Sequence, residues 1–254
     1  MSSLYELLTV GLRTIYDRRL SDPPILDGQR RFPAQERFAD AWAELRDEAL
    51  AVAKSLHTVP RFHELMAEQA DISARDQRDW RMFVLKAYGV EIAPNLARCP
   101  RLAALLADHP EVLSATLSFL APHKHIPEHR GPFRGILRFY LGLAVPRTPE
   151  GMPATELLID GTGYRIGEGE CLLWDDTYRH EVRHQSDEPR IALLLDVRRG
   201  SLPPDLAVLS RLLVLLAGLA VRWRRRGRTD PFVPPQLAAA GAAIMQAGSA
   251  PAGR

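Results

Sequence analysis

The sequence predicts a mainly β protein with flanking helices, built around an antiparallel sandwich or barrel. Between residues 113 and 199, seven short apolar runs follow one another, separated by glycine, proline and Asp-Glu pairs. On either side of this region the apolar residues recur at helical spacing instead. Apolar residues make up 46% and charged residues 25% of the 254 residues, so the chain can bury a substantial core.

The segment before the β region is expected to be mostly helical. Within residues 36–56, Phe38, Trp42, Leu45 and Ala49 recur at steps of three and four, which is a helix period. The elements expected here are a helix (1–20), a proline-rich connector (20–33), a helix (36–56), a strand (80–89) and a helix opened by Pro100 (99–110).

The segment after the β region contains a strongly apolar run, 206–221, which is short of the ~20 residues that span a bilayer. Trp223 and an arginine cluster, 222–228, follow at once. We favour a helix that packs on the domain or on a second subunit. The alternative is peripheral membrane association through residues 206–228. The low-complexity tail, 234–254, is expected to be poorly ordered.

The net charge, the cysteines and the N-terminal residues indicate the kind of partner and the cellular compartment to expect. The formal net charge is only +2, so no strong basic field indicates nucleic acid as a partner. Cys99 and Cys171 lie far apart and are expected to be reduced thiols. The first 20 residues lack the early positive charge and unbroken apolar core of a signal peptide. We therefore expect a cytoplasmic protein, with contact to the inner face of the membrane as the variant.

Histidines form two groups within the β region. One group lies at residues 123–129 and the other at residues 180–184. Imidazole is a common ligand of iron, zinc and copper, so two groups on neighbouring strands indicate a metal site. The histidines are His123, His125, His129, His180 and His184.

Two arginines are expected to point into the sandwich or barrel. Arg138 and Arg190 each lie in an apolar strand, nine residues after His129 and ten after His180. A buried guanidinium needs an anion, and a carboxylate held by two hydrogen bonds is the natural partner. Ser118, on the preceding strand, could donate a further hydrogen bond. Together these residues describe a site for a metal and a dicarboxylate.

Four segments carry a resemblance to a known family. They are "SFLAPHKHIPEHRGP", "LRFYLGLAVP", "GEGECLLWDDTYRHEV" and "PRIALLLDVRR". They resemble the aspartyl/asparaginyl β-hydroxylase family, which are oxygenases that depend on Fe(II), 2-oxoglutarate and O2. The resemblance implies a double-stranded β-helix, a jelly-roll and cupin-like core. Upstream, "LRDEALAVA", "WRMFVLKAYG" and "CPRLAALL" are similar to the bacterial lipid A acyl-chain hydroxylases of that family.

The resemblance implies three parts of the chain. Residues 1–112 would form a helical and strand segment packed on the core. Residues 113–200 would form the catalytic double-stranded β-helix, and residues 201–254 an apolar and basic helix with a flexible tail.

The resemblance also implies the metal ligands. His129 and His180 correspond to the two iron ligands of the family. Asp176 corresponds to a carboxylate that holds an iron-bound water. Asp175 is the less favoured of the pair, because alternation of faces lets only one of the two point inward.

The remaining implied residues concern the co-substrate. Arg190 corresponds to the partner of the distal carboxylate of 2-oxoglutarate, and Ser118 and Arg138 to further contacts with it. Tyr140 stands where the family usually has a histidine that helps to hold the co-substrate. Its hydroxyl could make that contact from a different distance.

The expected activity is hydroxylation of an unactivated C–H bond in a small-molecule, peptide or lipid substrate. Three substrate classes stay open: an aspartyl or asparaginyl side chain in a peptide, a free or carrier-bound amino acid, and a lipid acyl chain. One alternative is a cupin-type metal-binding protein that uses the histidines of "HKHIPEH" with Glu128. Another is a halogenase that uses the ligand position left vacant by Gly131.

Overall fold

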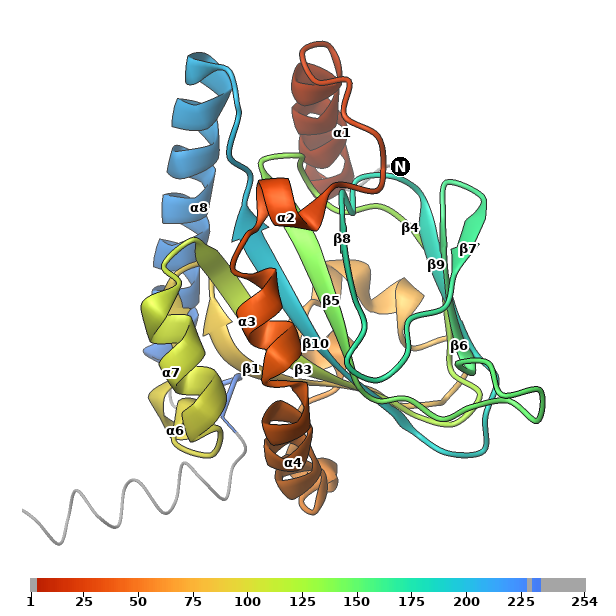
Figure 1. Cartoon of the computed structure of the whole chain (residues 1–254). Coiled ribbons are helices and arrows are strands. Elements are labelled where there is room, and N and C mark those ends of the chain that lie inside the picture. Colours follow the sequence, from red (N-terminus) through yellow and green to blue (C-terminus); the bar gives the residue numbers. More distant parts are fainter. Residues whose placement is uncertain (1–3, 228–229, 234–254) are drawn as a thin grey trace, which may run out of the picture.

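A computed structural model describes residues 4–227 and 230–233. The described residues form two antiparallel sheets that face each other, with helices around them (Figure 1). The large sheet has six strands in the order β2-β1-β3-β10-β5-β8, and the small sheet has four in the order β4-β9-β6-β7. The strands are β1 (Trp80–Ala87), β2 (Val90–Glu91), β3 (Val112–Leu120), β4 (His125–His129), β5 (Ile136–Ala144), β6 (Thr155–Ile159), β7 (Thr162–Tyr164), β8 (Cys171–Trp174), β9 (His180–His184) and β10 (Arg190–Arg198).

The order in which the chain visits the two sheets confirms the predicted fold. From β3 to β10 the chain alternates between the large and the small sheet, with β6 and β7 as one hairpin in the small sheet. This winding is the jelly-roll, or double-stranded β-helix. It is also why strands far apart in the chain become neighbours, as β10 does between β3 and β5.

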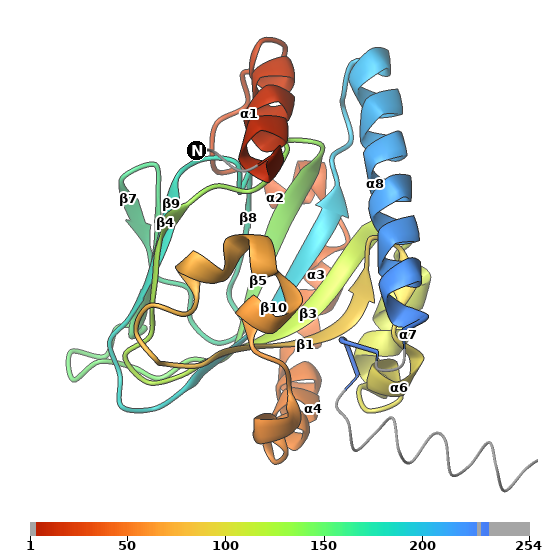
Figure 2. The same ribbon diagram turned by 180° about the vertical axis from the view of Figure 1, so that it is seen from behind.

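Alternation along the central strands separates two cores. On β5, Phe139 and Leu141 point outward and pack with Leu45 and Ala49 of the helix that covers the large sheet. Tyr140 points inward and packs with Trp174 and with residues of the small sheet. The inward face of the large sheet therefore borders the interior of the jelly-roll (Figure 2).

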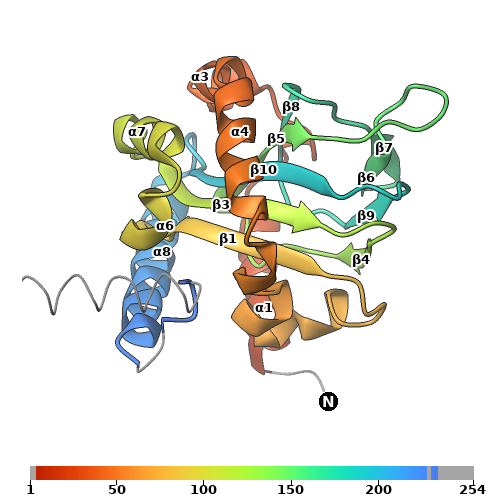
Figure 3. The same cartoon turned by 90° about the horizontal axis from the view of Figure 1, so that it is seen from below.

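The helices cover the large sheet and its ends. The helices are α1 (Leu4–Asp17), α2 (Gly28–Arg31), α3 (Gln35–Asp40), α4 (Trp42–Ala53), α5 (Phe62–Leu65), α6 (Ala93–Leu96), α7 (Pro100–Asp108) and α8 (Pro204–Arg225), with short 3-10 turns at η1 (Leu56–Thr58) and η2 (Ala67–Ile72). Seen from below, α3, α4 and α7 lie over one face of the large sheet (Figure 3).

Two expectations about the first 112 residues need refinement. The single helix expected over 36–56 is two helices, α3 and α4, with a break at Ala41. The bend lets Phe38 of α3 and Leu45 of α4 both reach the same core. The strand expected at 80–89 ends as β1 at Ala87, because Tyr88 and Gly89 form a turn with positive φ. β1 pairs with β3 across the expected boundary at residue 112, and that division of the chain stays a prediction.

The helix α8 is longer than the apolar run suggested. It has 22 residues, and it is long and apolar enough to cross a membrane by length and composition. The expectation that the segment is too short to span a bilayer is therefore wrong. One face of α8 packs on the domain, with Leu206, Ser210, Gly218 and Val221 buried. The expected poorly ordered tail, 234–254, lies outside the described residues.

A buried carboxylate ties four segments of the chain together. Asp175, directly after β8, is fully buried and accepts a hydrogen bond from Arg134 Nε at 2.8 Å and another from Arg199. Arg134 also contacts Asp17 at the end of α1, and Arg199 contacts Asp22. Thr177 donates to the other oxygen of Asp175 at 2.6 Å. The carboxylate therefore joins α1, the connector after it, β10 and the turn before β9.

Replacing Asp175 is expected to destabilise the fold. In Asp175→Asn, the two buried guanidiniums lose their shared charge partner, so unfolding should become easier by about 3–5 kcal/mol. Urea unfolding of the two proteins measures this difference. Asp47→Asn is the control, because Asp47 forms an exposed ion pair with Arg46 and should change stability by less than about 1 kcal/mol. Equal stability of the two variants would contradict the central role of Asp175.

Candidate active site

His129 and His180 meet because of the register between two strands. His129 ends β4, His180 begins β9, and the two residues stand directly opposite each other in the antiparallel ladder. Their ring centroids lie 4.0 Å apart. Directly opposed residues in an antiparallel pair point to the same side of the sheet. Both imidazoles therefore point into the interior of the jelly-roll.

The protonation of both imidazoles is set by the backbone. Nδ1 of His129 donates to the carbonyl oxygen of Pro127 at 2.8 Å, and Nδ1 of His180 donates to that of Tyr178 at 3.0 Å. Burial lowers the pKa of His129 and holds the pKa of His180 well below its ordinary value. Both rings are therefore neutral, with the Nε2 lone pair free. This is the state in which histidine binds a metal cation.

Arg190 lies at the large-sheet side of the same cavity. It is buried, and its Nη1 donates to Ser118 Oγ at 3.3 Å. Ser118 Oγ also accepts from Trp80 Nε1 at 3.0 Å, and the guanidinium lies over the ring of Tyr140, 5.6 Å from its centroid. No carboxylate of the described residues forms an ion pair with Arg190. The inward arginine thus keeps its charge available for an anionic ligand.

Arg138 has carboxylate partners within the chain. Its Nε donates to Asp196 Oδ1 at 2.7 Å, and Asp196 stands directly opposite it on β10. Its Nη2 donates to Asp176 Oδ2 at 3.2 Å. The requirement of this arginine for an anion is therefore met by the protein, although its side chain still lines the cavity with both histidines.

Asp176 occupies the space that Gly131 leaves open. The Gly131 amide donates to the Asp176 carbonyl oxygen at 2.7 Å, which holds the two loops together. A Cβ atom on Gly131 would lie 2.2 Å from Asp176 Oδ1, so a side chain at position 131 would displace the carboxylate. Burial raises the pKa of Asp176 to about 7, against the lowering effect of Arg138. Asp175 points away from this cavity to Arg134 and Arg199.

Three buried polar atoms around the histidines have no hydrogen-bond partner within the described part of the chain. They are Trp174 Nε1, Asp176 Oδ1 and Arg190 Nε. Trp174 packs edge-on against His180, with centroids 4.5 Å apart. A buried polar atom without a partner is costly, so this arrangement is suited to a polar ligand in the cavity. A metal with bound water and a dicarboxylate fits this donor set.

The histidines stand where two cavities adjoin. One is lined by Ser118, Arg138, Tyr140, Trp174 and Arg190 together with His129 and His180. The other is a groove of about 390 Å³ that also includes both histidines, Arg138 and Asp176. We call it the apolar groove, because it continues along Phe62 and Leu65 of α5, Met82 and Val84 of β1, and Leu213, Ala217 and Val221 of α8.

The structure brings together all seven residues singled out from the sequence, and their roles stay predictions. They are Ser118, His129, Arg138, Tyr140, Asp176, His180 and Arg190. Sequence reasoning missed Trp80, Trp174 and Asp196. Trp174 stands in the quoted segment "LLWDD", and its position two residues before Asp176 was the available signal. Asp196 had no local signal, because it contacts Arg138 across 58 residues.

The other histidines lie outside the cavity. His123 contacts Asp187, and His184 contacts Thr155 and the Glu188 carbonyl. His125 is half exposed and contacts Glu181, while Glu128 contacts Arg179. The cupin-type alternative would need His125 and Glu128 to face the cavity, and neither side chain lines it. Among residues 4–227 and 230–233, no group of three or more His, Cys, Asp or Glu side chains could hold a metal.

Comparison with curated proteins finds hydroxylases. The chain is 32% identical over 178 residues to an ornithine lipid ester-linked acyl 2-hydroxylase from Rhizobium tropici, covering 70% of this chain and 61% of that protein. It is 34% identical over 128 residues to the human aspartate beta-hydroxylase domain-containing protein 2, covering 47% of this chain and 33% of that protein. The chain thus spans less than two thirds of the length of these relatives.

Comparison with solved structures finds a chain described as an oxidoreductase of the 2OG-Fe(II) oxygenase family from Burkholderia pseudomallei. It is 14% identical with a TM-score of 0.39, and the match covers 54% of this chain and 78% of that one.

The family model described as aspartyl/asparaginyl beta-hydroxylase matches residues 39–200. That match spans more than half of the chain and includes both histidines, Asp176 and the inward arginines. The chain therefore belongs to the aspartyl/asparaginyl β-hydroxylase family of hydroxylases.

Proposed function

We propose that this protein is an Fe(II)- and 2-oxoglutarate-dependent dioxygenase that hydroxylates an unactivated C–H bond. One observation carries the proposal: two neutral imidazoles with free Nε2 atoms share a cavity with a buried arginine that has no carboxylate partner. When bound, iron and 2-oxoglutarate would supply the oxidising chemistry with O2. The protein would supply ligands, orientation and a pocket shielded from water.

His129 and His180 would hold the iron. Their Nδ1 hydrogen bonds to backbone carbonyls fix the orientation of both rings, as histidine ligands in metal sites require. Asp176 would orient a water beside the metal, because its Oδ1 is buried and has no other partner within the described residues. Its second oxygen is held by Arg138, which fixes the carboxylate in place.

Arg190 and Ser118 would hold the distal carboxylate of 2-oxoglutarate. The guanidinium offers a buried Nε without a partner, and Ser118 offers a hydroxyl already aligned by Trp80. Tyr140 would support this contact mainly through its ring, which lies under the guanidinium. This differs from the expectation that its hydroxyl contacts the co-substrate.

The position of Asp176 favours hydroxylation over halogenation. The space that a side chain at position 131 would occupy is filled by the Asp176 carboxyl group. In its ionised form this group would repel a halide bound beside it in a buried cavity. The pair Gly131 and Asp176 is therefore better suited to water than to chloride.

The apolar groove favours a lipid acyl chain over an aspartyl or asparaginyl side chain as substrate. It runs from the histidines to α8 and is lined mostly by apolar side chains, which would bury a chain of methylene groups. The relative from Rhizobium tropici is named for an acyl chain of an ornithine lipid. An amino-acid substrate remains the second candidate, because other relatives are named for aspartate or asparagine.

Loss of His180 should abolish iron binding. In anaerobic protein supplied with Fe(II) and 2-oxoglutarate, we expect a weak visible charge-transfer band that His180→Ala lacks. His184→Ala is the matched control, because His184 is buried on the same strand but bonded to Thr155 and a backbone carbonyl. An iron-loaded wild-type protein without the band would refute the proposed function.

Loss of Arg190 should weaken binding of the co-substrate rather than binding of the metal. Arg190→Ala leaves a carboxylate of 2-oxoglutarate without its charged partner, which costs about 1.5–3 kcal/mol, or roughly ten- to a hundredfold in Kd. Titration of the charge-transfer band measures this Kd. Arg165→Ala, which removes a partly buried arginine outside the cavity, is the control. An unchanged Kd in Arg190→Ala would remove this residue from the co-substrate site.

Narrowing the apolar groove should lower activity toward a lipid substrate and leave activity toward a peptide substrate unchanged. Ala217→Trp would fill the groove beside α8, so we expect kcat/KM for an ornithine lipid to fall more than about tenfold. Succinate formation with the lipid and with an aspartyl peptide compares the two classes. Ala220→Trp is the control, because Ala220 is exposed on the same helix. Turnover of the peptide alone by the wild type would overturn the acyl-chain assignment.

A further inference from the structure

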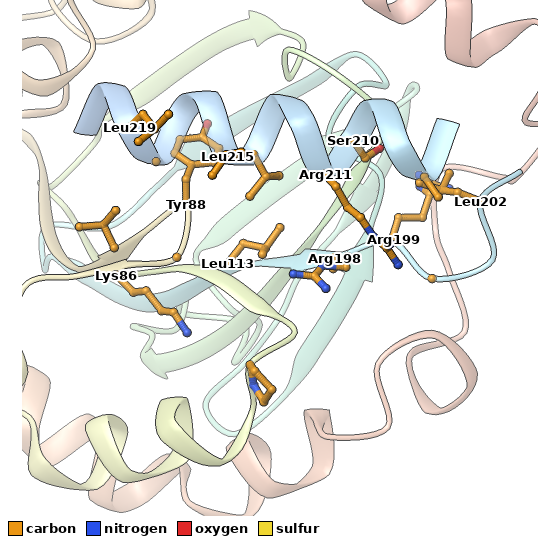
Figure 4. A pocket seen from close by; sticks show the side chains of 18 of the residues that line it. Lys86, Tyr88, Leu113, Arg198, Arg199, Leu202, Ser210, Arg211, Leu215 and Leu219 are labelled. Atoms are coloured by element: carbon orange, nitrogen blue, oxygen red, sulfur yellow. The ribbon is translucent and has the colours of Figure 1, made fainter. Parts of the chain in front are cut away.

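A second cavity lies on the other flank of α8, separate from the candidate active site. It has a volume of about 660 Å³ and lies between α8, the β1–β2 turn and the end of β10. Of its lining residues it shares only Lys86 and Tyr88 with the apolar groove. We call it the cationic cleft. Figure 4 shows Arg211 extending from α8 toward the strand that carries Arg198 and Arg199.

The charge of the cationic cleft is strongly one-sided. Its lining includes Lys86, Arg198, Arg211 and Arg222, against the single carboxylate of Glu91. Within the described residues, none of these four cations has an ion pair within 4 Å. The fifth cation, Arg199, is neutralised by Asp175 and Asp22 and belongs to the buried network. The remaining cations therefore form a field that attracts an anion.

Lys86 places a cation inside the cleft. The residue is only 7% exposed, its ammonium nitrogen reaches the open space of the cleft, and no described carboxylate forms an ion pair with it. Burial lowers the pKa of Lys86, and the carboxylates of Glu91 and Glu111 oppose that effect from a distance. An ammonium group in such partly desolvated surroundings attracts an anion more strongly than one on the open surface does. An anion in the cleft would therefore pair favourably with Lys86.

The rim of the cleft is apolar, whereas binding of a soluble anion would not require apolar side chains there. Leu202, Leu215 and Leu219 line the cleft itself. The outer face of α8 continues it with large side chains that are about half exposed or more: Val208, Leu212, Leu215, Leu216, Leu219 and Trp223, the last 76% exposed. We call this face the apolar stripe. Contiguous exposed apolar surface of this kind marks an interaction site.

The helix α1 adds further exposed apolar side chains near the start of α8. It packs against the first turns of α8 through the Tyr16 hydroxyl, 2.6 Å from Ser210 Oγ, and through the Arg19–Asp205 ion pair. Its outer side chains Leu7, Leu8, Val10 and Ile15 are exposed. In the two opposite views, α1 and the first turns of α8 lie at the same end of the molecule (Figures 1 and 2).

We propose that the cationic cleft binds the phosphate headgroup of an anionic phospholipid, while the apolar stripe lies against the acyl region of the bilayer. The cations supply the charge complement of the phosphate, and the leucines beside them suit the chain that follows a headgroup. A soluble phosphate compound would leave the stripe without a role. This binding is independent of the iron chemistry, because neither histidine lines the cleft.

Vesicle binding by the full chain tests the proposal. The two vesicle preparations are phosphatidylcholine alone and phosphatidylcholine mixed with phosphatidylglycerol. We expect strong co-sedimentation only with the anionic vesicles, and a blue shift of tryptophan emission that Trp223→Phe removes. Arg211→Gln/Arg222→Gln should weaken binding to anionic vesicles by on the order of tenfold or more, because each cation near an anionic surface contributes.

A buried variant separates the cleft from a diffuse basic surface. Lys86→Met removes a charge that lies inside the cleft rather than on the outer surface. We expect it to weaken anionic-vesicle binding by several-fold while its thermal unfolding stays as high as that of the wild type or rises. Arg147→Gln/Arg183→Gln is the control matched in charge to Arg211→Gln/Arg222→Gln, because both arginines are exposed and lie outside the cleft. This control should bind as the wild type does.

Several outcomes would overturn the proposal. Equal binding to neutral and anionic vesicles would exclude a phosphate headgroup. Loss of binding in Arg211→Gln/Arg222→Gln with full binding in Lys86→Met would indicate surface attraction only. Glycerol phosphate could instead bind in calorimetry and protect Lys86 from a lysine-modifying reagent, while the protein binds no vesicles. That result would assign the cleft to a soluble phosphate compound. Iron loading plays no part in these measurements, so their outcome does not depend on the proposed dioxygenase activity.

Discussion

The cross-strand pairing of His129 with His180 is the constraint on which the candidate site depends. The two residues are neighbours only because β4 and β9, separated by 50 residues of chain, form one antiparallel ladder with this register. A shift of one residue would turn one imidazole to the outer face. The backbone carbonyls two residues before each histidine then orient the rings. The pairing of β4 with β9 thus sets the position and direction of both imidazoles. The backbone carbonyls beside them set which ring nitrogen carries the proton.

The large sheet supplies the rest of the site through alternation of its faces. Phe139 and Leu141 face the helices, so the residues between and before them face the interior. This places Arg138 and Tyr140 beside the histidines. Polar side chains in such a place are unfavourable unless they are paired. Arg138 is paired with Asp196 and Asp176, whereas Arg190 keeps an unpaired Nε. The contrast between the two arginines is what distinguishes a structural ion pair from a candidate ligand site.

The helix α8 connects the two proposals. One flank lines the apolar groove that leads to the histidines, and the other flank lines the cationic cleft. Between them the apolar stripe faces outward. A helix that lies on a bilayer in this way would hold the mouth of the groove close to the lipid surface. In that arrangement, an acyl chain could reach His129 and His180 without leaving an apolar environment.

The spacing of apolar residues was enough to predict an antiparallel sandwich or barrel, because this spacing encodes which side chains share a face. The resemblance of four segments to a known family then implied the jelly-roll and completed the set of seven candidate residues, from Ser118 to Arg190. Sequence reasoning missed the short helices α2 and α5 and the break at Ala41, where no strong local period marks the element. Which residues become partners depends instead on the packing of the folded chain. Asp196 for Arg138, Trp174 for His180 and the two flanks of α8 all depend on how distant segments pair and pack, and local spacing carries no record of that choice.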